Sequence, residues 1–153
     1  MPKVRTRIWN GESAKYVHLK LDGHYTKIVT ELSGKVTVWT SHPTDITARC
    51  RNYGWLRPHY ARVPFGTVVL GELYVAGRPA SDVKTALAEE WQALQFSAFA
   101  VETMPICAPL EDVATFCTKY SIDFLPWRRI TDGDTVEALM EKLPYGAEGY
   151  VLK

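Results

Sequence analysis

The chain has 153 residues, of which 46% are hydrophobic and 23% charged, and its formal net charge is +1. This size and composition exclude a disordered chain and predict a single globular domain with a sizeable core. The near-neutral charge excludes binding of nucleic acid by overall charge alone, so any such contact must be local.

No apolar run approaches the roughly 20 residues that span a bilayer, and residues 1–15 lack the hydrophobic segment of a signal peptide. We therefore expect a cytoplasmic protein with no membrane partner. The cysteines contain no C-x-x-C pair and the histidines no helical ligand pair, so the sequence favours neither a disulfide framework nor a zinc site.

The N-terminal part of the chain is predicted to form strands. Apolar and polar residues alternate there over residues 16–22, 25–32 and 35–40. Gly34 suits a hairpin turn between the last two. Residues 67–75 are rich in β-branched side chains, and Gly71 within them marks a bulge or a close backbone approach.

Helices are predicted where the apolar spacing becomes helical, at residues 80–95, 110–121 and 132–143. Ser81 or Asp82 is placed to cap the first of them. Residues 96–102, 122–130 and 148–153 are predicted to be extended. The expected fold is α+β, with mostly antiparallel sheets and inserted helices.

The stretch "YVHLKLDGHY" contains ionisable residues at alternate positions, His18, Lys20 and Asp22. The period of a strand puts all of them on one face. Such a row is either an ordinary solvated face or an active site, and K-x-D-G by itself does not separate the two.

Further segments follow in order: "TSHPTDIT" (40–47), "VVLGELYV" (68–75), "FSAFAV" (96–101) and "AEGYVLK" (147–153). Together with K-x-D-G, this order resembles the ATP-grasp-like nucleotidyltransferase (adenylation) domain of ATP-dependent DNA ligases and of their RNA-ligase and mRNA-capping relatives. The resemblance covers nearly all of residues 1–153. It implies ATP and Mg²⁺ as cofactors, nicked DNA as partner and roles in DNA replication and repair.

Two alternatives stay open. One is an ATP-dependent RNA ligase, and the other is a non-catalytic nucleotide-binding module that keeps the ligase fold. A capping enzyme is a lesser possibility, which would use GTP.

The resemblance implies that Lys20 is the catalytic nucleophile and becomes a lysyl-AMP intermediate. It places Glu72 and Glu148 near the catalytic metal and Phe99 against adenine, although Phe99 could equally be a core residue. The residues expected to bind ATP are His18, Leu19, Asp22, Gly23, Tyr25, Ser41, Glu72 and Phe99.

Some positions depart from the family pattern. Tyr25 and Ser41 stand where Arg is common, His18 where Glu is common, and Leu70 where Asp is common. Only the Arg guanidinium is permanently charged and can form two parallel hydrogen bonds to one group. We therefore expect weaker binding of the ribose and of the nucleic-acid 5′-phosphate. The family's final lysine pair and OB-fold domain have no counterpart in these residues. We therefore expect an adenylation domain truncated at its C-terminus, or else a shortened chain that has lost part of its chemistry. We also expect a monomer.

The segment "ARCRNYGWLRPHYAR" (48–62) combines Arg49, Arg51, Arg57 and Arg62 with three aromatic residues and no acidic one. Charge beside stacking surfaces is how single-stranded or nicked nucleic acid is held. The alternative is a solvated connection whose aromatic residues return to the core.

Overall fold

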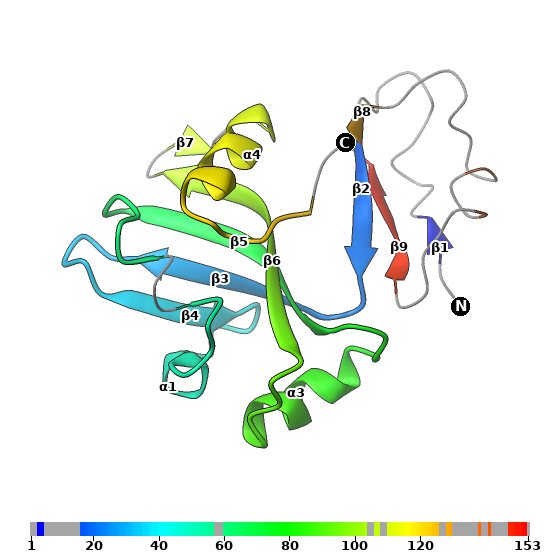
Figure 1. Cartoon of the computed structure of the whole chain (residues 1–153), viewed down its shortest axis with the longest axis horizontal. Coiled ribbons are helices and arrows are strands. Elements are labelled where there is room, and N and C mark those ends of the chain that lie inside the picture. The colour runs from blue at the N-terminus through cyan, green and yellow to red at the C-terminus, as the bar shows by residue number, and fades with distance from the viewer. Residues whose placement is uncertain are drawn as a thin grey trace. The chain divides into compact units, whose positions relative to one another are not determined.

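The computed structural model describes residues 3–4, 16–56, 60–103, 106–107, 110–125, 128–129, 138, 141 and 147–152. The chain divides into two compact units, residues 1–22 with 125–153 and residues 23–124 (Figure 1). Each unit contains a mainly antiparallel sheet, and helices are inserted between strands of the second. The predicted α+β class is therefore confirmed.

The first unit contains a four-stranded sheet in the order β1 (Lys3–Val4), β9 (Ala147–Leu152), β2 (Tyr16–Leu21) and β8 (Arg128–Arg129). β2 runs antiparallel to both of its neighbours, whereas β1 is parallel to β9. The sheet thus joins the two ends of the sequence. The helix predicted over 132–143 lies almost entirely outside the described residues.

The second unit contains a five-stranded sheet in the order β4 (Val36–Thr40), β3 (His24–Thr30), β5 (Thr67–Val75), β6 (Leu94–Thr103) and β7 (Ile106–Cys107). The strands predicted over 25–32 and 35–40 from alternation, and over 67–75 from β-branched composition, are confirmed within a few residues. Gly71 also behaves as predicted, because the pairing of β5 with β6 shifts register between Leu70 and Gly71.

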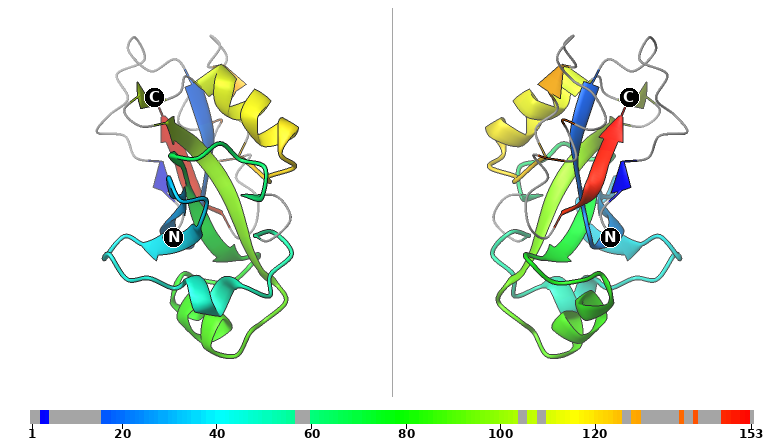
Figure 2. Two further views of the ribbon diagram at one scale, coloured as in Figure 1. Left: turned by 90° about the vertical axis from the view of Figure 1, so that its left-hand side faces the viewer. Right: turned by 90° about the vertical axis from the view of Figure 1, so that its right-hand side faces the viewer.

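One face of this sheet carries the core. Helices α1 (Thr47–Cys50), α3 (Ser81–Ala88) and α4 (Leu110–Lys119) contribute to it, and α1 and α3 lie side by side (Figures 1 and 2). The sheet contributes fully buried side chains such as Ile28, Val69 and Leu73. β-Branched and leucine residues at alternate positions supply this face, as the strand period requires.

The helix predicted over 80–95 is shorter than expected. α3 ends at Ala88. Leu94 and Gln95 belong instead to β6, where they pair with Val75 and Tyr74 of β5. The capping prediction was also wrong, because Ala80 is the N-cap and no side chain caps the helix. Within the described ranges no helix is long and apolar enough to cross a membrane.

Glu90 and Ser121 terminate α3 and α4 in the same way. Both adopt a left-handed backbone, with φ of 55° and 57°. In each case the next residue donates its amide across the helix end, Trp91 to the Ala86 carbonyl at 2.9 Å and Ile122 to that of Cys117 at 2.8 Å. This is the Schellman arrangement, in which glycine is the favoured residue because it has no Cβ to strain.

We expect Glu90→Gly and Ser121→Gly each to raise the free energy of unfolding by about 0.5–1 kcal/mol, because relief of left-handed strain outweighs the added entropy of the unfolded chain. Urea unfolding measures the change. Glu90→Ala, which keeps the Cβ, serves as the control and should give no gain. A glycine variant less stable than the parent would contradict the strain argument.

Candidate active site

Lys20 is brought next to the C-terminal motif by the pairing of β2 with β9. The backbone of Lys20 pairs with Gly149 and that of Leu21 with Ala147, so Glu148 is the extra residue of a β-bulge. Bulges commonly occur next to active sites, where they redirect one side chain. The side chains of His18, Leu19, Lys20 and Glu148 lie outside what the structure describes, and the backbone register carries this observation.

Phe99 occupies a second bulge, in β6. Leu70 pairs with Ala100 and Gly71 with Ala98, which leaves Phe99 as the extra residue. Two residues expected at the site, one in each unit, therefore sit at irregularities of their sheets. In a regular strand the side chains would simply alternate between the faces.

Tyr25, Glu72 and Ser97 are paired across three adjacent strands, so they share one face of the five-stranded sheet. We name this the Glu72 face and include Tyr74 and Phe99 in it. The rings of Tyr25 and Phe99 lie 5.8 Å apart at 45°. The Tyr74 hydroxyl and Ser97 Oγ are 3.3 Å apart, within hydrogen-bonding distance. The face is opposite the core and combines carboxylate, hydroxyl and aromatic groups.

Phe99 is half-buried on the Glu72 face, whereas Phe96, three residues earlier, is only 2% exposed and belongs to the core. The two phenylalanines therefore have different surroundings. Phe99 thus lies outside the core and contacts Tyr25, and its stacking on adenine stays a prediction.

Tyr25 differs chemically from the arginine that the sequence resemblance leads us to expect at its position. Burial raises the pKa of its phenol above the usual value of 10.0, and the nearby Glu102 carboxylate raises it further. The hydroxyl therefore stays protonated at neutral pH. It can donate one hydrogen bond but cannot supply positive charge.

Asp22 and Gly23 form the bend between β2 and β3, and Asp22 is half-buried. A Cβ on Gly23 would lie 2.3 Å from the Leu73 carbonyl oxygen and 3.0 Å from Glu72 Cγ. Only glycine fits so close to a neighbouring backbone. Gly23 is thus packed closely against β5, the strand that carries Glu72.

The other expected residues described in the second unit are exposed. Ser41 directly follows β4, one residue beyond the pairing of Thr40 with Thr26. Arg49, Arg51 and Arg62 are exposed, as binding to nucleic acid would require, and Arg57 lies outside the described residues.

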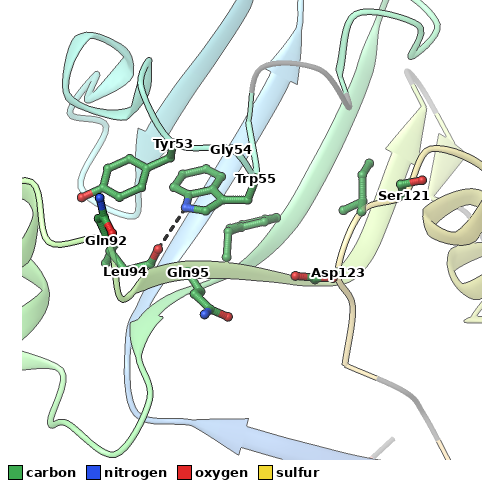
Figure 3. A pocket seen from close by; sticks show the side chains of 10 residues that line it. Tyr53, Gly54, Trp55, Gln92, Leu94, Gln95, Ser121 and Asp123 are labelled. Carbon is green, nitrogen blue, oxygen red and sulfur yellow. Dashed lines mark hydrogen bonds between the residues drawn. The ribbon is translucent and has the colours of Figure 1, made fainter.

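The aromatic residues of segment 48–62 do not form a free stacking surface. Tyr60 is 1% exposed and Tyr53 9%, and Trp55 stacks with both Tyr53 and Phe96 at 5.4 and 5.9 Å between ring centroids. The Trp55 indole donates to the Leu94 carbonyl at 3.1 Å (Figure 3). The expectation that these rings hold nucleic acid is therefore corrected, because they pack in or against the core.

The rings of Tyr53 and Trp55 line a pocket of about 400 Å³ together with Gln95 and Asp123 (Figure 3). None of the residues expected to bind ATP lines it. Within the second unit, the candidate site is therefore the Glu72 face, and this pocket is not part of it.

Cysteine chemistry is excluded for two of the thiols. Burial raises the pKa of Cys50 and of Cys117 to about 12, so both stay protonated and unreactive at neutral pH. Over the described ranges, no group of three or more His, Cys, Asp or Glu side chains is placed to hold a metal ion.

Sequence reasoning missed Tyr74, Ser97 and Glu102. Tyr74 could have been found, because it lies two residues after Glu72 and a strand period puts it on the same face. Ser97 and Glu102 could not, because their position depends on the register of β6 and on its bulge.

No protein-family model and no curated protein matches the sequence. Solved structures do match in fold. An archaeal ATP-dependent RNA ligase superposes with a TM-score of 0.62 at 16% identity, over 92% of this chain and 40% of that one. A Lig E DNA ligase, described as binding DNA with a minimal scaffold, gives 0.66 at 18% identity, over 99% and 59%.

An RNA ligase of Naegleria gruberi gives a TM-score of 0.65 at 12% identity, over 100% of this chain and 51% of that one. This chain thus spans between 40% and 59% of the length of these structures. At such identities the likeness concerns the fold. The chain has the nucleotidyltransferase fold that ATP-dependent RNA and DNA ligases share.

Proposed function

We propose that the chain is the adenylation domain of an ATP-dependent polynucleotide ligase, with Lys20 as its nucleophile and nicked DNA as its substrate. The observation that carries the proposal is the register of β2 with β9, which pairs Lys20 with Gly149 beside the bulged Glu148. Two motifs at opposite ends of the sequence thereby become neighbours in one sheet. An ordinary solvated strand would not require that pairing.

Within the second unit, Gly23 is packed against β5 beside Glu72. Tyr25, Glu72 and Phe99 share one face of the five-stranded sheet, which supports roles for all three in the same reaction.

The reaction has three steps. The neutral Lys20 amine attacks the α-phosphorus of ATP, the bond to the β-phosphate oxygen breaks, pyrophosphate leaves, and the nitrogen loses its proton. An oxygen of a 5′-phosphate then attacks the lysyl-AMP phosphorus and the N–P bond breaks. Finally a 3′-hydroxyl attacks the activated 5′-phosphate, which releases AMP and seals the strand.

The proposed roles follow from the chemistry of each side chain. Phe99 would stack on adenine, and the protonated Tyr25 hydroxyl would donate a hydrogen bond to the nucleotide. Glu72 and Glu148 would hold Mg²⁺, since carboxylate and phosphate oxygens are the donors this ion prefers. When bound, the ion neutralises charge on the phosphate oxygens.

The test is covalent labelling. Incubation with Mg²⁺ and ATP labelled at the α-phosphate should leave label on the protein, whereas γ-labelled ATP should leave none, because the β and γ phosphates depart as pyrophosphate. Addition of a nicked DNA duplex bearing a 5′-phosphate should remove the label and yield sealed product. A parallel nicked RNA duplex measures the RNA-ligase alternative.

Other outcomes decide against the proposal. Labelling by α-labelled GTP and not by ATP would indicate a capping-type enzyme. Absence of label with either nucleotide would favour the non-catalytic module. Sealing of RNA alone would move the proposed substrate from DNA to RNA.

A further inference from the structure

A pocket of about 350 Å³ lies in the second unit between the start of β4 and the segment that follows α1. Its base is apolar, formed by Val36, Leu56 and the almost completely buried Tyr60. Lys35 and Arg51 line it, and both are exposed. None of its lining residues is acidic.

The polar groups of the pocket differ in what they can still bind. The Thr47 hydroxyl is already used, because it accepts the Val38 amide at 2.8 Å and donates to Asp45 Oδ1 at 2.5 Å. The Lys35 and Arg51 side chains form no ion pair or hydrogen bond with another described residue. The polar side chains of the pocket that can still bind a ligand are therefore the two cations, Lys35 and Arg51.

Asp45 is the nearest competing charge. Its pKa is lowered mainly by the hydrogen bonds from Thr47, and Lys35 adds a smaller effect. Asp45 therefore stays ionised, but its carboxylate is held by Thr47 and does not line the pocket. The excess charge inside the pocket remains positive.

The backbone at Lys35 and at Arg51 is fixed by neighbouring contacts. The turn that carries Lys35 is closed by hydrogen bonds from the Glu31 amide to the Lys35 carbonyl at 2.8 Å and from the Gly34 amide to the Glu31 carbonyl at 2.9 Å. Phe65 packs over this turn, since a Cβ on Gly34 would lie 3.0 Å from its ring. Arg51 directly follows Cys50, which is fully buried.

We infer that this pocket binds a backbone phosphate of the nucleic-acid substrate through Lys35 and Arg51. The inference rests on the proposed function, which supplies a polyanionic partner. Two cations in an acid-free concavity more than neutralise the single negative charge of a backbone phosphate, and a guanidinium and an ammonium that line one pocket offer it several donors. Arg62 follows Ala61 in the pocket wall and extends the positive charge along the chain.

The test measures binding of a fluorescent nicked DNA duplex by anisotropy at several salt concentrations. Lys35→Ala with Arg51→Ala should lower the affinity on the order of tenfold and reduce the slope of log K against log salt by about 1, as loss of one phosphate contact requires. An intact duplex should lose affinity equally, because a phosphate contact carries no sequence information. Both residues are exposed, so thermal unfolding should be unchanged.

A matched variant, Lys84→Ala with Lys119→Ala, removes the same charge from exposed positions on α3 and α4. It should leave the affinity and the salt slope nearly unchanged. An equal loss of affinity in this variant would overturn the inferred phosphate site, because net charge alone would then explain the effect. Unchanged binding in the Lys35 and Arg51 variant would also overturn it.

ATP is the other source of phosphate and is measured separately. Lysyl-AMP labelling should show the same ATP dependence in the pocket variant as in the parent. Weaker ATP dependence with unchanged duplex binding would overturn the inference by assigning the pocket to the nucleotide. Failure of the parent to label would count against the proposed function, whereas the duplex measurements would still decide this site.

Discussion

Lys20→Ala is expected to abolish covalent labelling by α-labelled ATP completely. No other group would then offer a nucleophilic amine at this point of β2, next to the bulged Glu148. Lys20→Arg should abolish the label as well, because a guanidinium stays protonated at any usable pH and has no lone pair for attack on phosphorus. Gel autoradiography after denaturation measures the label, because only a covalent bond survives.

Lys84→Ala is the matched control, since Lys84 is an exposed lysine on α3. It should label at the parent rate. Label that persists in Lys20→Ala would show that another residue is the nucleophile. The row of ionisable groups in "YVHLKLDGHY" would then be an ordinary strand face.

Gly23→Ala is expected to destabilise the protein by about 3 kcal/mol and to slow labelling on the order of 100-fold. The new Cβ would lie 2.3 Å from the Leu73 carbonyl oxygen and 2.8 Å from Tyr74 Cβ, and neither neighbour is the end of a flexible side chain. Overpacking of this kind typically costs 1–3 kcal/mol, and backbone neighbours favour the upper end. The strand that must move carries Glu72, and a shift of about 1 Å in a positioning group can cost a factor of 100.

Urea unfolding and the initial rate of labelling measure the two effects. Gly54→Ala provides the comparison, because a Cβ there meets nothing within 4 Å. It should leave the labelling rate within error of the parent and raise the free energy of unfolding by at most about 1 kcal/mol, because alanine reduces the entropy of the unfolded chain. A Gly23→Ala variant as stable and as active as Gly54→Ala would contradict the close packing of Gly23 against β5.

The features that stabilise the fold of this chain differ from those expected to serve its reaction. The five-stranded sheet and its core account for the fold of the second unit, and a non-catalytic module would need no more. The bulges beside Lys20 and at Phe99 add nothing to that core. Covalent labelling is the measurement that separates an enzyme from a module.

The strands were determined largely by the sequence itself. In residues 67–75 the β-branched composition gave both ends of β5, and the single glycine marked its irregularity, because strand period and glycine geometry are local properties. The order of short motifs likewise indicated the fold. These signals depend on neighbours in the sequence and need no knowledge of distant contacts.

Only the tertiary structure decided where α3 ends and which phenylalanine is free of the core. Residues 89–95 have helical spacing, but Leu94 pairs with Val75, and that distant pairing outweighs local propensity. Similarly, alternation along a strand puts Phe96 and Phe99 on opposite faces, but only the packing of the helices against one face decides that Phe96 lies in the core and Phe99 near Tyr25. The aromatic residues of 48–62 follow the same rule, since Tyr53 and Trp55 donate to the carbonyls of Trp91 and Leu94. Register and long-range burial are properties of the folded chain, and no short stretch of sequence contains them.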